Sequence, residues 1–180
     1  VIEHIPGQLI IKEYPTKSAT TRTLNVHLEK LRQKGIEPDM IIVDYADLLR
    51  PVRSQREKRN ELETIYEELR GIASEMECPI WTASQANKDS SKSDVVGLEN
   101  LGESYGKAQV ADVVLSISRK PMEKSTGGGR IFVAKNRAGR DGLLFPINID
   151  TAKSKFEILD DTEMTLNEAV SQDRNDMKNK

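Results

Sequence analysis

The chain has 180 residues, enough for one domain with a core of its own, and its formal net charge of −2 excludes a protein that is basic overall. Any contact with nucleic acid would therefore come from local basic loops. A single cysteine, Cys78, excludes an internal disulfide framework and a CxxC metal site, and no apolar run approaches the ~18 residues of a membrane span, so we expect an intracellular protein without a membrane partner.

The first half of the chain predicts alternating strands and helices. Residues 7–14 form a short apolar run that predicts a strand, and residues 20–35 carry leucines at helical spacing. The run 40–45, MIIVDY, predicts a second strand, and its continuous apolar character is typical of parallel strands covered on both faces. Residues 56–77 form the longest helical pattern. Residues 78–85 predict a third strand.

The second half predicts mainly strands, with Gly-rich turns between the last three. These strands are 111–118, 130–137, 143–150 and 154–159. Alternation followed by a run of strands favours the α/β class, with a mostly parallel sheet flanked by helices and an antiparallel extension at the carboxyl-terminal edge. Residues 1–159 would form the domain, and the polar residues 160–180 would form a mobile tail.

Three of the predicted strands end on polar groups that suit nucleotide chemistry. Asp44 follows the second strand, Ser84 and Gln85 end the third, and Lys135 and Arg137 close a later one. Ligands of open parallel α/β sheets lie beyond the carboxyl ends of the strands. These groups are therefore candidates for a single site.

Each of these groups has a nucleotide role and a plainer alternative. Asp44, which we expect to be buried at the strand tip, suits Mg²⁺ held through a metal-bound water, although apolar strands also end in Asp as loop anchors. Gln85 suits an amide that orients an attacking water or senses a γ-phosphate, although a Gln also hydrogen-bonds its own loop. Lys135 and Arg137 point to one side of a strand and could reach one anion, as an arginine finger does, or could protect an edge strand.

Four segments, read in order, resemble the ATPase domain of DnaB-type replicative helicases, including their phage versions. They are MIIVDYADLLRP, ELRGIASEMECPIWTASQANK, LGESYGKAQVADVVLSISR and RIFVAKNRAGRDGLLFPINID, and the match runs over about residues 7–158. The resemblance implies a RecA-like fold and an ATP-driven motor that moves on single-stranded DNA and unwinds duplex. It further implies a primase and a helicase loader as partners, in the cytoplasm of a bacterial or phage-infected cell.

The resemblance assigns roles at the first two strand ends. Asp44 and Tyr45 match the family's Walker B element, and Ser84 and Gln85 match its SQ pair. ATP and Mg²⁺ are the cofactors this implies, with Asp44 as the metal residue and Ser84 and Gln85 beside the nucleotide.

Two later elements of the family also have counterparts. Glu103 lies ahead of the strand start at Asp112, as in the family, and Lys135, Arg137 and Gly139 match its K-x-R-x-G element. In the family this last element reaches the nucleotide of the adjacent subunit in a hexameric ring. The resemblance therefore implies a ring of identical subunits, with Lys135 and Arg137 acting in catalysis and nucleotide binding.

The chain departs from the family in having no G-x-x-x-x-G-K-[ST], because the glycines of STGGGR are followed by Arg130 and a strand. We interpret the chain as the carboxyl-terminal portion of a longer helicase, with the P-loop upstream of Val1, and we expect it to be inactive alone. The family's catalytic glutamate would then fall near Glu13, although the family usually has an acid pair there and Lys12 precedes Glu13.

Two segments are candidates for contacts with single-stranded DNA. Residues 48–59 match a family loop that faces the central channel, and their cations suit sequence-independent phosphate contacts, although they could also be the solvated first turns of a helix. Residues 87–104 are the second segment and match a family segment that lines the pore. A separate loop, residues 119–129, looks like a mobile hairpin tip. The candidate DNA-binding residues are Arg50, Arg53, Arg56, Lys58, Arg59, Lys88, Lys92, Glu103 and Lys107.

Two other functions stay open at this point. A RecA-like strand-exchange or clock-type ATPase would share the fold and the acid-tipped strand, although the KNRAG element favours the helicase. A non-catalytic module that only assembles, or that inhibits a helicase ring by mimicry, would explain the absence of a P-loop.

Overall fold

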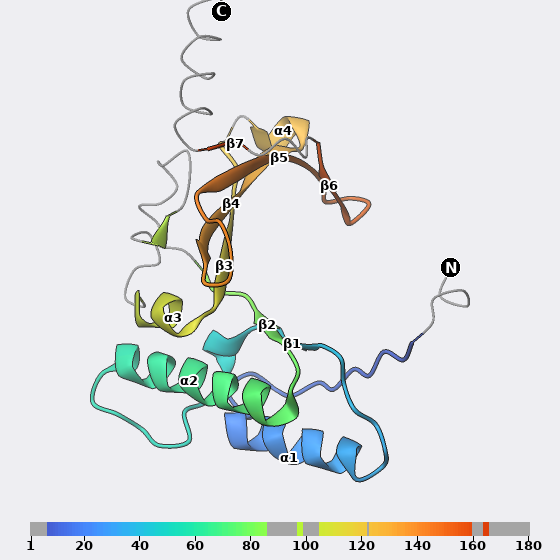
Figure 1. Cartoon of the computed structure of the whole chain (residues 1–180), viewed down its shortest axis with the longest axis vertical. Coiled ribbons are helices and arrows are strands. Elements are labelled where there is room, and N and C mark those ends of the chain that lie inside the picture. Colours follow the sequence, from blue (N-terminus) through green and yellow to red (C-terminus); the bar gives the residue numbers. More distant parts are fainter. Residues whose placement is uncertain (1–6, 86–96, 99–104, 122, 160–163, 166–180) are drawn as a thin grey trace, which may run out of the picture.

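Two sheets, one parallel and one antiparallel, form the framework of the part of the chain that the structure describes (Figure 1). The computed structural model describes residues 7–85, 97–98, 105–121, 123–159 and 164–165. The elements are α1 (Thr21–Arg32), β1 (Ile41–Val43), η2 (Ala46–Leu48, a 3-10 helix), α2 (Lys58–Met76), β2 (Ile80–Thr82), α3 (Tyr105–Val110), β3 (Val113–Ser118), α4 (Glu123–Thr126), β4 (Gly128–Asn136), β5 (Leu143–Asp150), β6 (Lys155–Ile158) and β7 (Met164–Thr165).

The first helix begins at a capping box that its own sequence supplies. The Thr20 hydroxyl accepts a hydrogen bond from the backbone N–H of Thr23 at 3.2 Å, and the Thr23 hydroxyl accepts one from the N–H of Thr20 at 3.2 Å. These bonds satisfy donors that a helix start leaves free. Gly35 follows the helix with φ of 74°, a conformation that glycine adopts readily. The predicted helix is confirmed.

Helices α1 and α2 cover one face of the parallel pair β1 and β2 (Figure 1). The two strands pair with Ile42 opposite Trp81. Leu28 of α1, Ile72 of α2 and Ile41 of β1 are buried together. Ile42 is 71% exposed, because these two helices lie on the other face. The expectation that this strand is covered on both faces is therefore wrong for the residues that the structure describes.

A second group of buried residues fastens η2 to α2. Ala46, Ile65 and Leu69 pack together, and Ile65 is 1% exposed. We expect Ile65→Ala to lower the free energy of unfolding by about 2–5 kcal/mol, because truncation leaves a cavity in a packed core. Urea unfolding measures this loss. The exposed Ile42 provides the control, since Ile42→Ala should change stability by less than about 0.5 kcal/mol, and equal losses would contradict this core.

The second sheet is antiparallel, with the order β3-β4-β5-β6 and with β7 beside β5. Its first four strands lie within or close to the four predicted runs. The α/β class is confirmed. The expectation of a mostly parallel sheet is not met among the described strands, since two of them are in the parallel sheet and five in the antiparallel one. Within the described residues, no helix has the length and apolar character needed to cross a membrane.

Residues 7–14 do not form the predicted strand. The segment is extended, and Leu9 is 84% exposed. A strand depends on a neighbour that pairs with its backbone groups, and no described strand pairs with this segment. The apolar pattern of residues 7–14 alone was therefore insufficient to predict a strand.

Two expectations for loops and termini also need correction. The predicted hairpin tip 119–129 contains the short helix α4, and Arg130 forms an ion pair of 2.6 Å with Glu123 beside it. Strand β7 lies inside the predicted mobile tail, where its backbone pairs with Leu143 and Leu144 of β5. The rest of that tail lies outside the described residues.

Candidate functional site

The ends of β1 and β2 bring two of the predicted groups close together. Val43 pairs with Thr82, so Asp44 and the segment leading to Ser84 leave the sheet side by side. The Thr82 hydroxyl joins the two exits, since it donates to the carbonyl of Val43 at 2.9 Å and accepts from the N–H of Ala46 at 2.8 Å. This edge of the parallel pair is therefore well ordered.

Asp44 itself is exposed, so the expectation of a buried carboxylate is wrong. The strand that carries it is only half covered, and its end opens to solvent. Among the described residues, no hydrogen bond or ion pair engages the Asp44 side chain. Gln85 is exposed as well. Both groups are accessible to a ligand.

A different acid, three residues later, lies at the centre of a polar cluster. The Asp47 carboxylate is 2.7 Å from the Lys107 ammonium and accepts hydrogen bonds from Ser84 Oγ at 3.2 Å and from the Tyr66 hydroxyl at 3.0 Å. Lys107 Nζ also donates to Ser84 Oγ at 3.1 Å and lies 5.4 Å from the centre of the Tyr66 ring. We call Asp47, Tyr66, Ser84 and Lys107 the Asp47 cluster.

The burial of Lys107 in the Asp47 cluster changes the interpretation of this lysine. Lys107 is 7% exposed, and its ammonium is committed to Asp47 and Ser84. The proposed contact of Lys107 with DNA is therefore wrong for this structure, because the side chain has turned inward to a largely buried acid. Burial, followed by the charge of Asp47, raises the pKa of Tyr66 well above its usual range, so the phenol remains a donor.

The predicted paired cations lie at the carbonyl end of α3. Lys135 Nζ donates to the carbonyls of Ala108, Gln109 and Ala111 at 2.8, 3.0 and 2.7 Å. Arg137 donates to the carbonyl of Gln109 at 3.2 Å. The two cations thus share one carbonyl of α3, whereas the predicted shared target is an anion, and that prediction stays untested. Burial, followed by the charge of Arg137, lowers the pKa of Lys135.

Arg137 is also paired with an acid of its own chain. Its guanidinium lies 2.9 Å from Asp112 Oδ1, and Arg70 of α2 lies 2.9 Å from the same oxygen. All three side chains are about half exposed. Exposed ion pairs contribute ~0–1 kcal/mol, so Arg137 can leave Asp112 at little cost. We call Arg70, Asp112, Lys135 and Arg137 the Arg137 cluster.

The loop between η2 and α2 presents three of the candidate DNA cations. It is held to α2 by Glu61, whose Oε1 accepts hydrogen bonds from Ser54 Oγ at 3.0 Å and from the N–H of Gln55 at 2.9 Å. The cations therefore project from an anchored loop. They are Arg50, Arg53 and Arg56, and Arg59 is exposed in the first turn of α2.

The remaining predicted site residues take no part in the clusters described above. Lys58 begins α2, and its side chain is outside the described set. Lys88, Lys92 and Glu103 lie outside the described residues. Glu13 is described, and it is exposed in the extended segment before α1 rather than at a strand tip.

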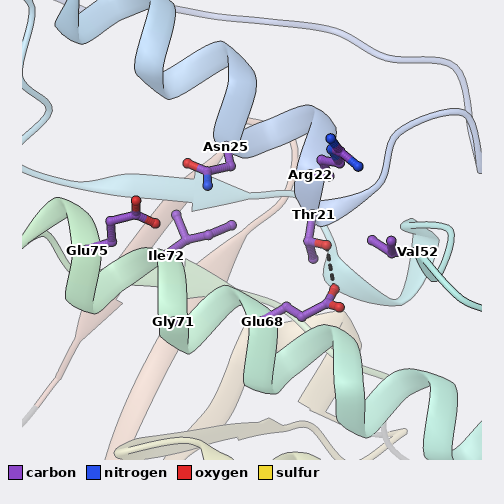
Figure 2. A pocket seen from close by; sticks show the side chains of 8 residues that line it. All are labelled: Thr21, Arg22, Asn25, Val52, Glu68, Gly71, Ile72 and Glu75. Atoms are coloured by element: carbon purple, nitrogen blue, oxygen red, sulfur yellow. Dashed lines mark hydrogen bonds between the residues drawn. The ribbon is translucent and has the colours of Figure 1, made fainter.

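A shallow groove of about 370 Å³ lies away from these groups, between α1 and α2 (Figure 2). Thr21 donates to Glu68 across it at 2.5 Å, and Asn25 and Glu75 lie farther along its length. None of the described residues at the ends of β1 and β2 lines this groove. The groove is therefore separate from the candidate nucleotide edge.

The model of the DnaB-like helicase C-terminal domain family matches residues 4–158. The chain belongs to this family. A DnaB-like replicative helicase of Enterobacteria phage T4 is 36% identical over 115 residues, which are 62% of this chain and 24% of that protein. A probable plasmid replicative DNA helicase of Chlamydia trachomatis is 35% identical over 132 residues, which are 72% of this chain and 28% of that protein.

Two solved structures support the fold of this DnaB-like domain. One is described as an ATPase domain and superposes with a TM-score of 0.70 at 20% identity, covering 79% of this chain and 52% of that one. The other, a DnaB-like replicative helicase studied with its primase, gives a TM-score of 0.70 at 19% identity, covering 79% and 36%. The RecA-like fold is confirmed. The chain spans about a quarter of the length of the two curated relatives, 24% and 28%.

Sequence reasoning missed three of the residues that organise this DnaB-like domain. Asp47, Tyr66 and Arg70 have no motif of their own, and each gains its importance from a partner distant in sequence. Their partners lie 19, 42 and 60 residues away along the chain, so no local pattern marks them.

Proposed function

We propose that this chain is part of an ATP-dependent replicative DNA helicase, which hydrolyses ATP at subunit interfaces, translocates on single-stranded DNA and unwinds duplex. The observation that carries the proposal is the pairing of β1 with β2 in a chain of this family, which brings Asp44 beside the segment bearing Ser84 and Gln85. Both curated relatives are described as replicative helicases, and their origin in a phage and a bacterium supports a role inside bacterial cells.

Asp44 fits a magnesium ion better than Asp47 does. Asp44 is exposed and unengaged among the described residues, whereas Asp47 is neutralised by Lys107. Within the described part of the chain there is no group of three or more His, Cys, Asp or Glu side chains that could hold a metal. The single exposed carboxylate of Asp44 suits Mg²⁺, which takes one or two carboxylates and keeps several waters. Bound there, Mg²⁺ would neutralise charge on the phosphates of ATP.

The other polar groups complete the proposed ATP site. Gln85, exposed beyond β2, would orient the attacking water or sense the γ-phosphate. Arg137 would leave Asp112 and act on the nucleotide of a neighbouring subunit, with Lys135 beside it. Ser84 would act near the nucleotide through the Asp47 cluster, and Glu13 is the candidate for the catalytic glutamate.

Single-stranded DNA and identical subunits are the proposed partners. The exposed arginines after η2 suit salt-sensitive contacts with phosphates. An arginine that acts on a neighbouring nucleotide requires an adjacent subunit, and we propose that the subunits form a hexameric ring. One structure of the same fold was studied together with its primase, which supports a primase as a further partner. A helicase loader is the last partner we propose.

The proposed contacts of this loop with DNA phosphates predict that removing its arginines changes the salt dependence of DNA affinity. Replacing Arg50, Arg53 and Arg56 with Ala should reduce the slope of log affinity against log salt by about 2, since each phosphate contact on a single strand contributes roughly 0.7. Fluorescence anisotropy with a labelled oligonucleotide measures the slope. Lys30→Ala on α1 is the matched control, and an unchanged slope in the triple variant would exclude this loop from the DNA interface.

The proposed ATP-driven activity is tested with the longest form of the protein that the reading frame encodes. We expect it to hydrolyse ATP faster in the presence of single-stranded DNA, whereas the 180-residue chain alone should bind ATP feebly and hydrolyse none. A full reading frame without a P-loop, or without any turnover, would favour a non-catalytic module instead.

A further inference from the structure

Helix α3 connects the two halves of the proposed site. Its Lys107 joins the Asp47 cluster at the exit of β2, and the next residue, Ala108, gives its carbonyl to Lys135 of β4. The distances are 3.1 Å from Lys107 Nζ to Ser84 Oγ and 2.8 Å from Lys135 Nζ to the carbonyl of Ala108. One short helix, which lies beside α2, thus contacts the segment that follows β2 through Lys107 and contacts β4 through the carbonyl of Ala108 (Figure 1).

The contact at the β2 exit is the firmer of the two. Lys107 and Asp47 are both largely buried, and Asp47 also receives the Tyr66 hydroxyl. A buried charge that loses its partner is costly, so these side chains hold one arrangement. Ser84 belongs to the same network and is the immediate neighbour of Gln85. A shift of the Gln85 backbone would therefore act on Lys107 through the hydrogen bonds of the Ser84 hydroxyl, which is itself exposed.

The contact of α3 with the paired cations Lys135 and Arg137 can change more easily. Lys135 holds three carbonyls at the end of α3, but Arg137 is held by one exposed carboxylate and one carbonyl. Arg70 competes for the same oxygen of Asp112. A small displacement of α3 would alter the position of Arg137 without disrupting a core.

We propose that α3 couples the exit of β2 to the paired cations, with Lys107 and Asp47 as positioning residues for Gln85 and Arg137. A change at Gln85 passes through Ser84 and Lys107 to α3, and from α3 to Lys135 and Arg137. This inference rests on the proposed function for what the coupling serves. The physical link between the β2 exit and α3 does not depend on it.

A pair of variants separates coupling from simple stability. Lys107→Met leaves Asp47 buried without its ion pair and should lower the melting temperature by on the order of 10 °C. Adding Asp47→Asn removes the unpaired charge, so the double variant should recover most of that loss while still lacking the link. Lys124→Met, on the exposed surface of α4, is the matched control and should change nothing.

Hydrogen exchange on the 180-residue chain reads out the physical link. In the double variant, the amide of Ala46, which donates to Thr82 at the β2 exit, and the amides of α3 and Ala111 should exchange about tenfold faster than in the wild type, while the amides of β5 keep their rates. Wild-type exchange at Ala46 and throughout α3 in the folded double variant would overturn the proposal. This readout requires no ATP turnover.

ATP turnover by the longest encoded form tests whether the link between the β2 exit and α3 serves DNA-stimulated hydrolysis. In the double variant, the ratio of DNA-stimulated to basal hydrolysis should fall about tenfold, with the KM for ATP within about twofold of the wild type. A wild-type ratio in that variant would overturn the coupling role. Absence of turnover in the wild type would instead refute the proposed function, and hydrogen exchange would still decide whether α3 is linked to the β2 exit.

Discussion

Replacing Asp44 with Asn is expected to lower ATP turnover by about a thousandfold, because the loss of a metal-binding carboxylate removes several kcal/mol of transition-state stabilisation. The stability of the protein should hardly change, since Asp44 is exposed and unengaged among the described residues. Steady-state turnover and thermal unfolding of the longest encoded form measure the two effects.

Asp47, three residues away, provides the matched control. Asp47→Asn keeps the shape of the side chain but leaves the Lys107 ammonium buried without its ion pair. This variant should lose stability, whereas Asp44→Asn should lose turnover. If the two variants exchanged these effects, the metal residue would have been assigned to the wrong acid.

Arg137→Ala is expected to lower turnover by about 10³–10⁵-fold, the usual contribution of an arginine finger. ATP binding should remain largely intact, because the residue acts on charge that develops during phosphoryl transfer. Stability should change little, since the ion pair with Asp112 is half exposed. Single-turnover hydrolysis and a nucleotide-binding titration separate the two quantities.

Arg70→Ala is the control for the loss of the ion pair. Arg70 and Arg137 both lie 2.9 Å from the same oxygen of Asp112, so each variant removes one equivalent interaction. We expect Arg70→Ala to retain most of the turnover. Loss of ATP binding in Arg137→Ala, or equal loss of turnover in both variants, would give Arg137 a structural role within its own subunit.

The elements with strong periodic patterns were predictable from the sequence. The apolar stripe of α2 and the capping threonines of α1 act locally, and both helices form close to the predicted residues. The segment 7–14 has an equally apolar pattern but lacks a pairing partner among the described strands. Local pattern therefore indicates what a segment can form, and tertiary contacts decide whether it forms.

The predicted gathering of the candidate groups at one sheet edge holds only in part. Asp44 directly follows β1, but Gln85 lies three residues beyond β2, and Arg137 follows β4 of the separate antiparallel sheet. All three remain candidates. The burial of Lys107 was not predictable, because its partner Asp47 is 60 residues away and no periodicity connects them. The exposure of Asp44 was missed because a continuously apolar strand indicates a buried one, whereas β1 is covered on one face.

Mixing two inactive variants of the longest encoded form tests most directly whether the ATP site lies between subunits. One variant carries Asp44→Asn and the other Arg137→Ala, so an intact Asp44 meets an intact Arg137 only where the two proteins are neighbours. We predict that equimolar mixing and reassembly restore turnover to roughly a quarter of the wild-type rate, as expected if catalytic residues act across the interface. A mixture as inactive as its components, despite mixed assembly, would contradict the shared site.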